Sequence, residues 1–323
     1  MIKRTQNKVA ESRFTLPATA AYAIAVWLLS GQLIPIVPFT SNQIIQGAWI
    51  QLICFIVSTY LMVELNNSNA LIRIYSRMVS CSFIMLLCAG CFMFGSLSGA
   101  IVQLCLVASC LMLFHCYQDR HSVGWTFYAF LFVGLSSLLF IQILFYVPFL
   151  WIMMFFQMTA LSWRTFYASI LGLFTPYWFI APYFVFHADT STPVSHLSEL
   201  ISFSTPFDYS QITFNQMLLF IFVVLLGVTG IVHYLRNQSA DSIRIRMLYG
   251  CFIYLFIFTV IFLILQPQHF DILIRILIIN TSPLIAHFIS LTHTRITNVA
   301  FLIISTVAVL MTLFNLWMPS FSF

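Results

Sequence analysis

Long apolar runs that contain no charged residue constrain this chain more than any other feature. An α-helix needs ~20 such residues to cross ~30 Å of hydrocarbon, and the runs here are about 16 to 22 residues long. Apolar residues make up 61% of the 323 residues and charged residues only 7%, whereas a soluble domain carries roughly 25% charged residues. The runs lack the period-two alternation of barrel strands. The sequence therefore predicts an all-α fold, a polytopic transmembrane helical bundle.

We expect about 11 spans, from the length of the apolar runs and the charges between them. The expected spans are 18–38, 46–64, 78–95, 99–116, two within 126–159, 166–187, 217–235, 247–266, 274–291 and 297–317. Residues 126–159 are the ambiguous part, because 34 uncharged residues, about 50 Å of helix, are too long for one crossing and short for two. A break near Phe140 to Phe145 would keep Arg164 on the same side as the other basic residues, so we expect two short spans.

The basic residues set the orientation. With this threading, 12 of the 13 Lys and Arg residues lie on one side of the membrane and only Arg275 lies on the other. Short loops that are rich in Lys and Arg remain in the cytoplasm. The N-terminus is therefore expected inside and the C-terminus outside, in the inner (cytoplasmic) membrane of a bacterium.

The domain organisation follows from this topology. We expect a cytoplasmic tail at 1–17, a single transmembrane helical domain at 18–317 and a short outer tail at 318–323. No cleavable signal peptide is expected, since the first apolar run is followed by prolines and not by a small-residue cleavage pattern. The only long loop is 188–216, on the outer side. Within it, residues 193–201 are consistent with a short amphipathic helix at the membrane interface.

Candidate ligand contacts on the outer side gather around one cation. Arg275 is the only basic residue expected there, and Asp271 precedes it by four residues, about one helical turn. Either the two form a local ion pair, or Arg275 contacts a phosphate or carboxylate at the mouth of a cavity. The outer candidates are completed by His269, Asp189, Glu199 and Asp208.

A second candidate group lies on the inner side. Arg73 and Arg77, with Glu64, Asn66 and Asn67, could hold an anionic head group at the cytoplasmic leaflet. The alternative is a solvated loop whose arginines only set the topology.

Polar residues at membrane depth are costly unless they are paired, and they often mark a pathway. The main ones are Gln103, Gln142, Gln157, Asn280, His287 and Asn315. The simplest interpretation is hydrogen bonding between helices. No Asp, Glu, Lys or Arg lies at the centre of an expected span, which argues against an ion-coupled transporter or proton pump.

The remaining motifs predict no cofactor and no metal. Cys88 and Cys91 form a C-x-x-C pair, but seven of the eight cysteines fall within apolar runs and the eighth at a span end, so helix packing is the expected role. No catalytic residue is predicted. The net charge of +5 is spread over several segments and does not form a nucleic-acid patch.

The middle of the chain resembles a known family. The segments Leu65-Asn66-Asn67, Leu71-Ile72-Arg73, Gly134 to Phe140, Leu161 to Arg164 and Gly172 to Tyr177 are similar to those of uncharacterised multispanning proteins of Bacteroidota, which carry a domain of unknown function. The resemblance covers roughly residues 45–190. It implies a multi-pass inner-membrane protein and supplies no catalytic residue.

Two function classes remain open. The first is a non-enzymatic membrane component of an envelope pathway, a subunit, scaffold or permease-like protein. Its expected partners are the lipid bilayer and other envelope membrane proteins. The second is an integral-membrane transferase that acts on a lipid-linked sugar. Such enzymes usually carry an acidic residue in the first outer loop, and residues 39–46 contain none, so the first class is favoured.

Overall fold

The computed structural model describes residues 5–33, 42–187, 191–201, 207, 209 and 212–317. In this part of the chain all regular structure is helical, and no β-strand is present. The all-α prediction is confirmed.

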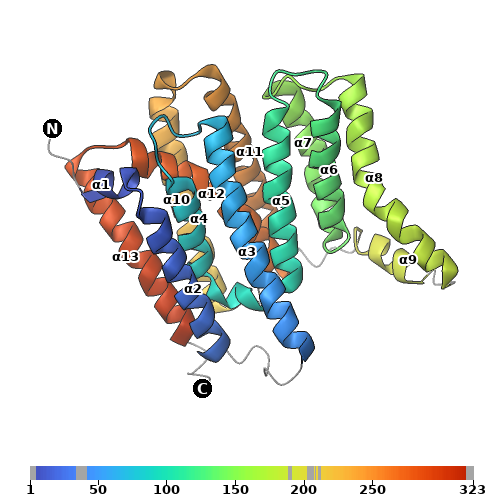
Figure 1. Ribbon diagram of the computed structural model, residues 1–323, viewed down its shortest axis with the longest axis horizontal. Coiled ribbons are helices and arrows are strands. Elements are labelled where there is room, and N and C mark those ends of the chain that lie inside the picture. The colour runs from blue at the N-terminus through green and yellow to red at the C-terminus, as the bar shows by residue number, and fades with distance from the viewer. Residues whose placement is uncertain are drawn as a thin grey trace.

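The helices follow one another with short connections (Figure 1). The α-helices of the first half are α1 (Thr5–Glu11), α2 (Thr15–Leu33), α3 (Asn42–Asn69), α4 (Met78–Ala89), α5 (Leu97–His115), α6 (Val123–Ser137) and α7 (Tyr146–Phe156). The second half contains α8 (Trp163–Phe186), α9 (Ser191–Ser198), α10 (Phe214–Asn237), α11 (Ile243–Leu265), α12 (Phe270–Leu291) and α13 (Arg295–Trp317). Four 3-10 helices complete the described residues: η1 (Cys91–Gly95), η2 (Ile141–Phe145), η3 (Gln238–Ala240) and η4 (Pro267–His269).

Seven helical segments of the described chain are long and apolar enough to cross a membrane: 47–69, 97–115, 163–186, 214–240, 243–265, 267–291 and 295–317. The protein is therefore a helical membrane protein. Helical structure is also present in the other four expected spans, but α2, α4, α6 and α7 offer shorter apolar stretches. The number of crossings stays a prediction.

The long uncharged stretch 126–159 is broken in the middle. Helix α6 ends at Ser137, the short helix η2 follows, and α7 begins at Tyr146. The break thus lies where it was expected, at Phe140 to Phe145. Tyr146 Oη donates a hydrogen bond to Thr259 Oγ1 at 3.1 Å, which fastens the start of α7 to α11.

The expected span 78–95 is not one continuous α-helix. Helix α4 ends at Ala89, and η1 follows after Gly90. A Cβ atom at Gly90 would clash with the Met93 side chain and lie 2.7 Å from that of Leu219, so the lack of a side chain at Gly90 leaves room for these two residues. Ser96 then caps α5 by accepting a hydrogen bond from Gly99 N.

The expected amphipathic helix of the outer loop is present in part. Helix α9 begins two residues before 193 and ends three residues before 201. It lies beside the lower end of α8 in Figure 1, at the edge of the bundle. None of its residues is fully buried, which is consistent with an interfacial position.

Helix α12 is the centre of the bundle. Nearly all of its residues are buried, because α4, α5, α10 and α11 all pack against it. The opposite extreme is α8, which packs mainly on α6 and exposes most of its large apolar side chains. In a membrane that face would contact lipid.

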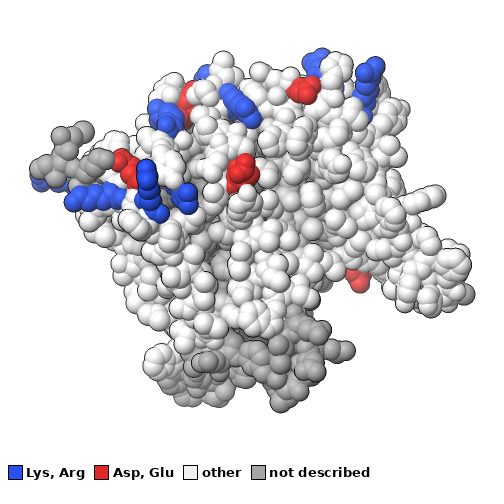
Figure 2. Space-filling model, viewed as in Figure 1, with Lys and Arg blue, Asp and Glu red and all other residues white. Residues whose placement is uncertain are grey.

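The loops after α3, α5, α7, α10 and α12 lie at one end of the bundle, the upper end in Figure 1. On the face shown in Figure 2, basic side chains are seen at this end and around α1, and the lower half of the described surface is almost free of charge. On this face, the charges of the described residues are thus concentrated at one end of the bundle.

Two glycines set the distance between α6 and α8. A Cβ atom at Gly172 would lie 2.5 Å from Phe127 O, and one at Gly134 would lie 2.7 Å from Leu173 O. Both neighbours are backbone atoms, which cannot turn aside as a side chain can. Small residues of this kind let helices approach closely in membranes.

We expect Gly172→Ala to destabilise the protein by about 1 to 3 kcal/mol, because the added methyl group must push α8 away from α6. The measurement is thermal unfolding of the purified protein in detergent. Gly124→Ala is the matched control, since a Cβ atom there meets nothing within 4 Å. Equal melting temperatures for the two variants would show that the α6–α8 contact does not depend on a small residue at Gly172.

Candidate functional site

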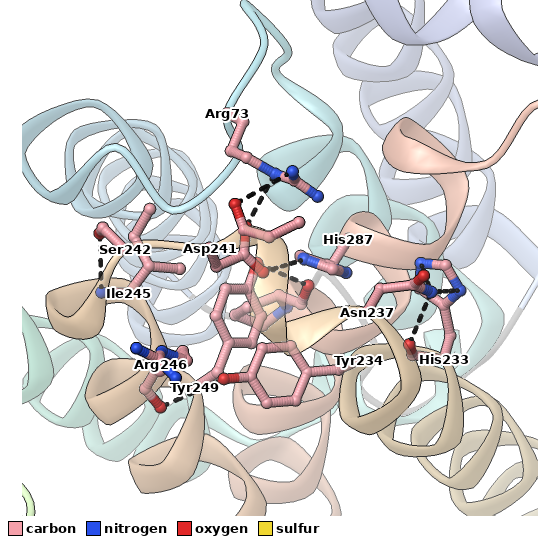
Figure 3. Close-up of polar contacts among 12 residues, drawn as sticks. Arg73, His233, Tyr234, Asn237, Asp241, Ser242, Ile245, Arg246, Tyr249 and His287 are labelled. Carbon is pink, nitrogen blue, oxygen red and sulfur yellow. Dashed lines mark hydrogen bonds and ion pairs between the residues drawn. The ribbon is translucent and has the colours of Figure 1, made fainter.

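A buried carboxylate lies at the basic end of the bundle. Asp241 follows η3 in the turn between α10 and α11, and its side chain is fully buried. Arg73, in the loop between α3 and α4, and His287, near the end of α12, both contact it (Figure 3). We call Arg73, Asp241 and His287 the inner triad.

The two contacts use both carboxylate oxygens. Arg73 Nε lies 2.8 Å from Asp241 Oδ1, and His287 Nε2 lies 3.2 Å from Oδ2. Arg73 Nη1 also donates to Ala240 O at 3.2 Å. The arginine side chain is 37% exposed, whereas the histidine is fully buried. The inner triad therefore reaches from the aqueous end of the bundle into its core.

Aromatic rings enclose the histidine. The ring of Tyr249 lies 5.0 Å from that of His287, and the rings of Tyr234 and His233 lie at 5.5 and 5.4 Å. Tyr234 and Tyr249 stack on each other at 4.8 Å. Nδ1 of His287 is buried and has no hydrogen-bond partner among the described residues.

Within the inner triad, Arg73 and His287 offset the cost of burying the Asp241 carboxylate. A carboxylate taken out of water costs several kcal/mol unless it is paired and hydrogen-bonded. Arg73 supplies a permanent positive charge. His287 contacts the second carboxylate oxygen through its ring nitrogen.

The α3–α4 loop is held in place by other polar contacts. Asn66 Nδ2 donates to Ser76 O at 2.9 Å, and the hydroxyl groups of Ser76 and Ser290 lie 3.1 Å apart. Arg244 Nη2 donates to Asn69 Oδ1 at 2.9 Å. The loop is therefore tied to both α11 and α12, which fixes the position of Arg73.

The inner candidates predicted from the sequence separate in the structure. Arg73 belongs to the inner triad, but Arg77 turns to Tyr75, with Nε 3.1 Å from the phenolic oxygen and the guanidinium 6.0 Å from the ring centre. The amide of Asn66 donates to the backbone of Ser76. These residues therefore do not form one head-group pocket, because Arg73 forms an ion pair with Asp241.

At the other end of the bundle, Arg275 is only 3% exposed. Its Nη2 donates to the Met93 carbonyl, Nη1 lies 3.3 Å from Gln103 Oε1, and Nε lies 3.5 Å from Asp271 Oδ1. The local ion pair with Asp271 is confirmed. The expectation that Arg275 meets a ligand at an open mouth needs correction, because helix packing buries its guanidinium and protein acceptors surround it.

The other outer candidates lie around the start of α12 or outside the described residues. Asp271 is partly exposed, and His269 packs edge-on against Phe140 at 5.1 Å. Glu199 is exposed, and its carbonyl accepts a hydrogen bond from Gln142 at 3.1 Å. Asp189 and Asp208 lie outside the residues that the structure describes.

Asp241 was not among the candidates predicted from the sequence. It is the only acidic residue between the expected spans 217–235 and 247–266. His287 was predicted as a polar residue at membrane depth, and the structure pairs it with Asp241. An acidic residue among arginines, with a histidine inside a nearby span, is the signal that could have found the pair.

The cysteines are free thiols, and seven of the eight are buried. Burial raises the pKa of the Cys116 thiol, which keeps it protonated at neutral pH. No group of three or more His, Cys, Asp or Glu side chains that could hold a metal ion occurs among the described residues.

Comparison of the chain with protein-family models, with curated proteins and with solved structures found no match. The site therefore has to be interpreted from its own geometry.

Replacing the buried acid tests the inner triad. We expect Asp241→Asn to destabilise the protein by roughly 1 to 3 kcal/mol, because Arg73 loses its counter-charge and His287 loses a charged acceptor. Thermal unfolding in detergent measures the effect. Asp119→Asn is the control, since Asp119 is exposed and an amide oxygen can still accept the hydrogen bond from His121 N. If the two variants melt at the same temperature, Asp241 does not carry a buried charge.

Proposed function

We propose that this protein is a non-enzymatic integral component of the inner membrane of a bacterium, of the permease-like kind, with α12 as the helix along which polar cargo passes. The observation that supports the proposal is the polar content of α12. It is the most buried of the seven long apolar helices, yet it carries charged contacts near both of its ends.

The polar residues of α12 continue between these ends. Asn280 and His287 are seven residues apart, about two helical turns, so they lie on the same face, and Arg275 and Ser282 are related in the same way. All four are buried. The side-chain oxygens of Asn280 and Thr281 have no hydrogen-bond partner among the described residues.

If α12 only filled the core of a scaffold, Leu or Ala at these positions would make the protein more stable. Ionisable and amide groups at membrane depth are expensive, and where they occur they usually face the bundle interior and mark a pathway for ions or substrate. Pro283 lies in the middle of α12, where it removes a backbone hydrogen bond and favours a local bend. These features favour a permease-like role over a static scaffold.

For the topology we propose 11 crossings, with the N-terminus in the cytoplasm and the C-terminus outside. The position of five loops at one end of the bundle (Figure 1) and the basic side chains seen there (Figure 2) support this orientation, because basic loops stay inside. The bilayer and other envelope membrane proteins are the proposed partners.

The transferase alternative requires a cavity that contains Asp189, Glu199 or Asp208. Two of these lie outside the described residues. Glu199 is exposed beside η2. The buried polar residues of α12, by contrast, lie in the described part of the chain and favour the permease-like role.

Cysteine accessibility tests the proposal. In a variant without native cysteines, we expect Asn280→Cys to react with a membrane-impermeant, charged maleimide in intact vesicles, because a pathway must admit water to this face of α12. Ile257→Cys is the control, since Ile257 is 47% exposed on α11 and would face lipid, where the reagent does not enter. Ser239→Cys, at the basic end, should react from the cytoplasmic side only.

A static scaffold would give a different pattern. Asn280 is 1% exposed, so without a conformational change its thiol would remain unlabelled from both sides while Ser239→Cys still reacts. That result would contradict the permease-like role.

A further inference from the structure

A cavity of about 160 Å³ lies beside the N-terminal helices, at the basic end of the bundle. Helices α1, α2, α4, α10, α12 and α13 all contribute to its walls, and it is partly open to the outside of the bundle. Among its lining residues are Val9, Thr15, Phe222, Ile285, Phe301 and Ala308. None of them belongs to the inner triad.

The wall of the cavity is apolar, although hydroxyl-bearing residues contribute to it. Three of these four hydroxyl groups bond to the backbone of their own segments, and the fourth, that of Ser82, is buried without a hydrogen-bond partner among the described residues. Thr15 Oγ1 donates to Val9 O at 2.6 Å, Thr19 Oγ1 to Leu16 O at 3.0 Å, and Ser305 Oγ to Leu302 O at 3.0 Å. An occupant therefore meets carbon atoms, which suits a hydrocarbon and not a polar solute.

Basic residues flank the part of the wall formed by α1 and α2. Lys8 precedes Val9, and Arg13 lies two positions before Thr15; both side chains are exposed. Phe14, between the helices, is 81% exposed. Exposed cations beside a projecting aromatic side chain are typical of a segment that lies at the surface of an anionic membrane.

Helix α1 is fixed in this position by the α12–α13 connection. Gln6 Nε2 donates to Ile289 O and to Thr292 Oγ1, both at 2.6 Å, and Thr5 Oγ1 donates to Asn298 Oδ1 at 2.8 Å. The short helix is thus anchored with its basic side chains outward. Figure 2 shows basic side chains gathered on this part of the surface.

We propose that this cavity binds part of one acyl chain of an anionic phospholipid, the rest of the chain lying along its open side, with the lipid phosphate held by Lys8 and Arg13. The apolar wall selects the hydrocarbon chain, and the two cations select a negative head group over a zwitterionic one. A lipid in this cavity would contact α12 through Ile285 and Ile289 and α1 through Val9. This inference is independent of the permease-like role, since it rests on the apolar wall of the cavity and not on the polar residues of α12.

The test measures binding of two lipids by native mass spectrometry of the protein in detergent: phosphatidylglycerol and phosphatidylcholine with identical palmitoyl and oleoyl chains. Ser305→Phe places a ring in the cavity from its partly exposed side, so it should weaken binding of both lipids by about tenfold through loss of apolar contact. Ala181→Phe, at an exposed position of α8, is the matched control and should bind as the wild type does.

The double variant Lys8→Gln with Arg13→Gln should lower the affinity for phosphatidylglycerol by about tenfold or more and leave phosphatidylcholine nearly unchanged, because each cation contributes about 1 kcal/mol to anionic lipid binding. The control variant Arg120→Gln with Arg164→Gln removes two exposed cations that lie outside the helices lining the cavity. It should have no such effect. Unchanged phosphatidylglycerol binding in Ser305→Phe, or an equal loss in the two charge variants, would overturn the proposal. Melting temperatures near wild type for both test variants show that the comparison concerns binding and not folding.

Discussion

The buried carboxylate of Asp241 needs partners that neutralise its charge, and three segments of the fold meet to supply them. A negative charge without water needs a positive partner and hydrogen-bond donors, or it costs several kcal/mol. Here the partners come from two distant parts of the chain: Arg73 from the loop after α3, and His287 from α12. The inner triad therefore fixes three segments relative to one another at the basic end of the bundle (Figure 3), where hydrophobic packing alone would leave their positions less defined.

Helix α12 connects this end of the protein to the other. Arg275 lies close to the opposite end of the helix, where its Nη1 and Nη2 donate to Gln103, the Met93 carbonyl and Asp271. Its Nε is buried without a hydrogen bond among the described residues. A helix that runs through the centre of a bundle with paired charges near each end and unpaired amide and hydroxyl oxygens between them is costly to maintain. That cost is the physical reason for assigning the function to α12 and not to the exposed, aromatic α8.

Much of the fold could be predicted from the sequence because bilayer thickness limits the length of a crossing helix. The break at η2 was predicted from length and from the position of Arg164. The site could be predicted only in part. Arg73 was among the candidates, and the Asp271–Arg275 pair follows from their spacing of four residues. The burial of Arg275 depends on Gln103, which is far away in the sequence. The ion pair of Asp241 with Arg73 depends on the position of the α3–α4 loop relative to α12. Neither contact leaves a local pattern in the sequence.

A double-mutant cycle on Arg73 and Asp241 tests the central interaction most directly. The free energy of unfolding would be measured in mixed micelles by SDS titration for the wild type, Arg73→Gln, Asp241→Asn and the double variant. If the two side chains hold the inner triad together, the losses in the single variants are not additive, and the coupling energy is about 1 kcal/mol or more in favour of the pair. Additive losses, within about 0.5 kcal/mol, would show that Asp241 is stabilised without Arg73 and would contradict the central role of this ion pair.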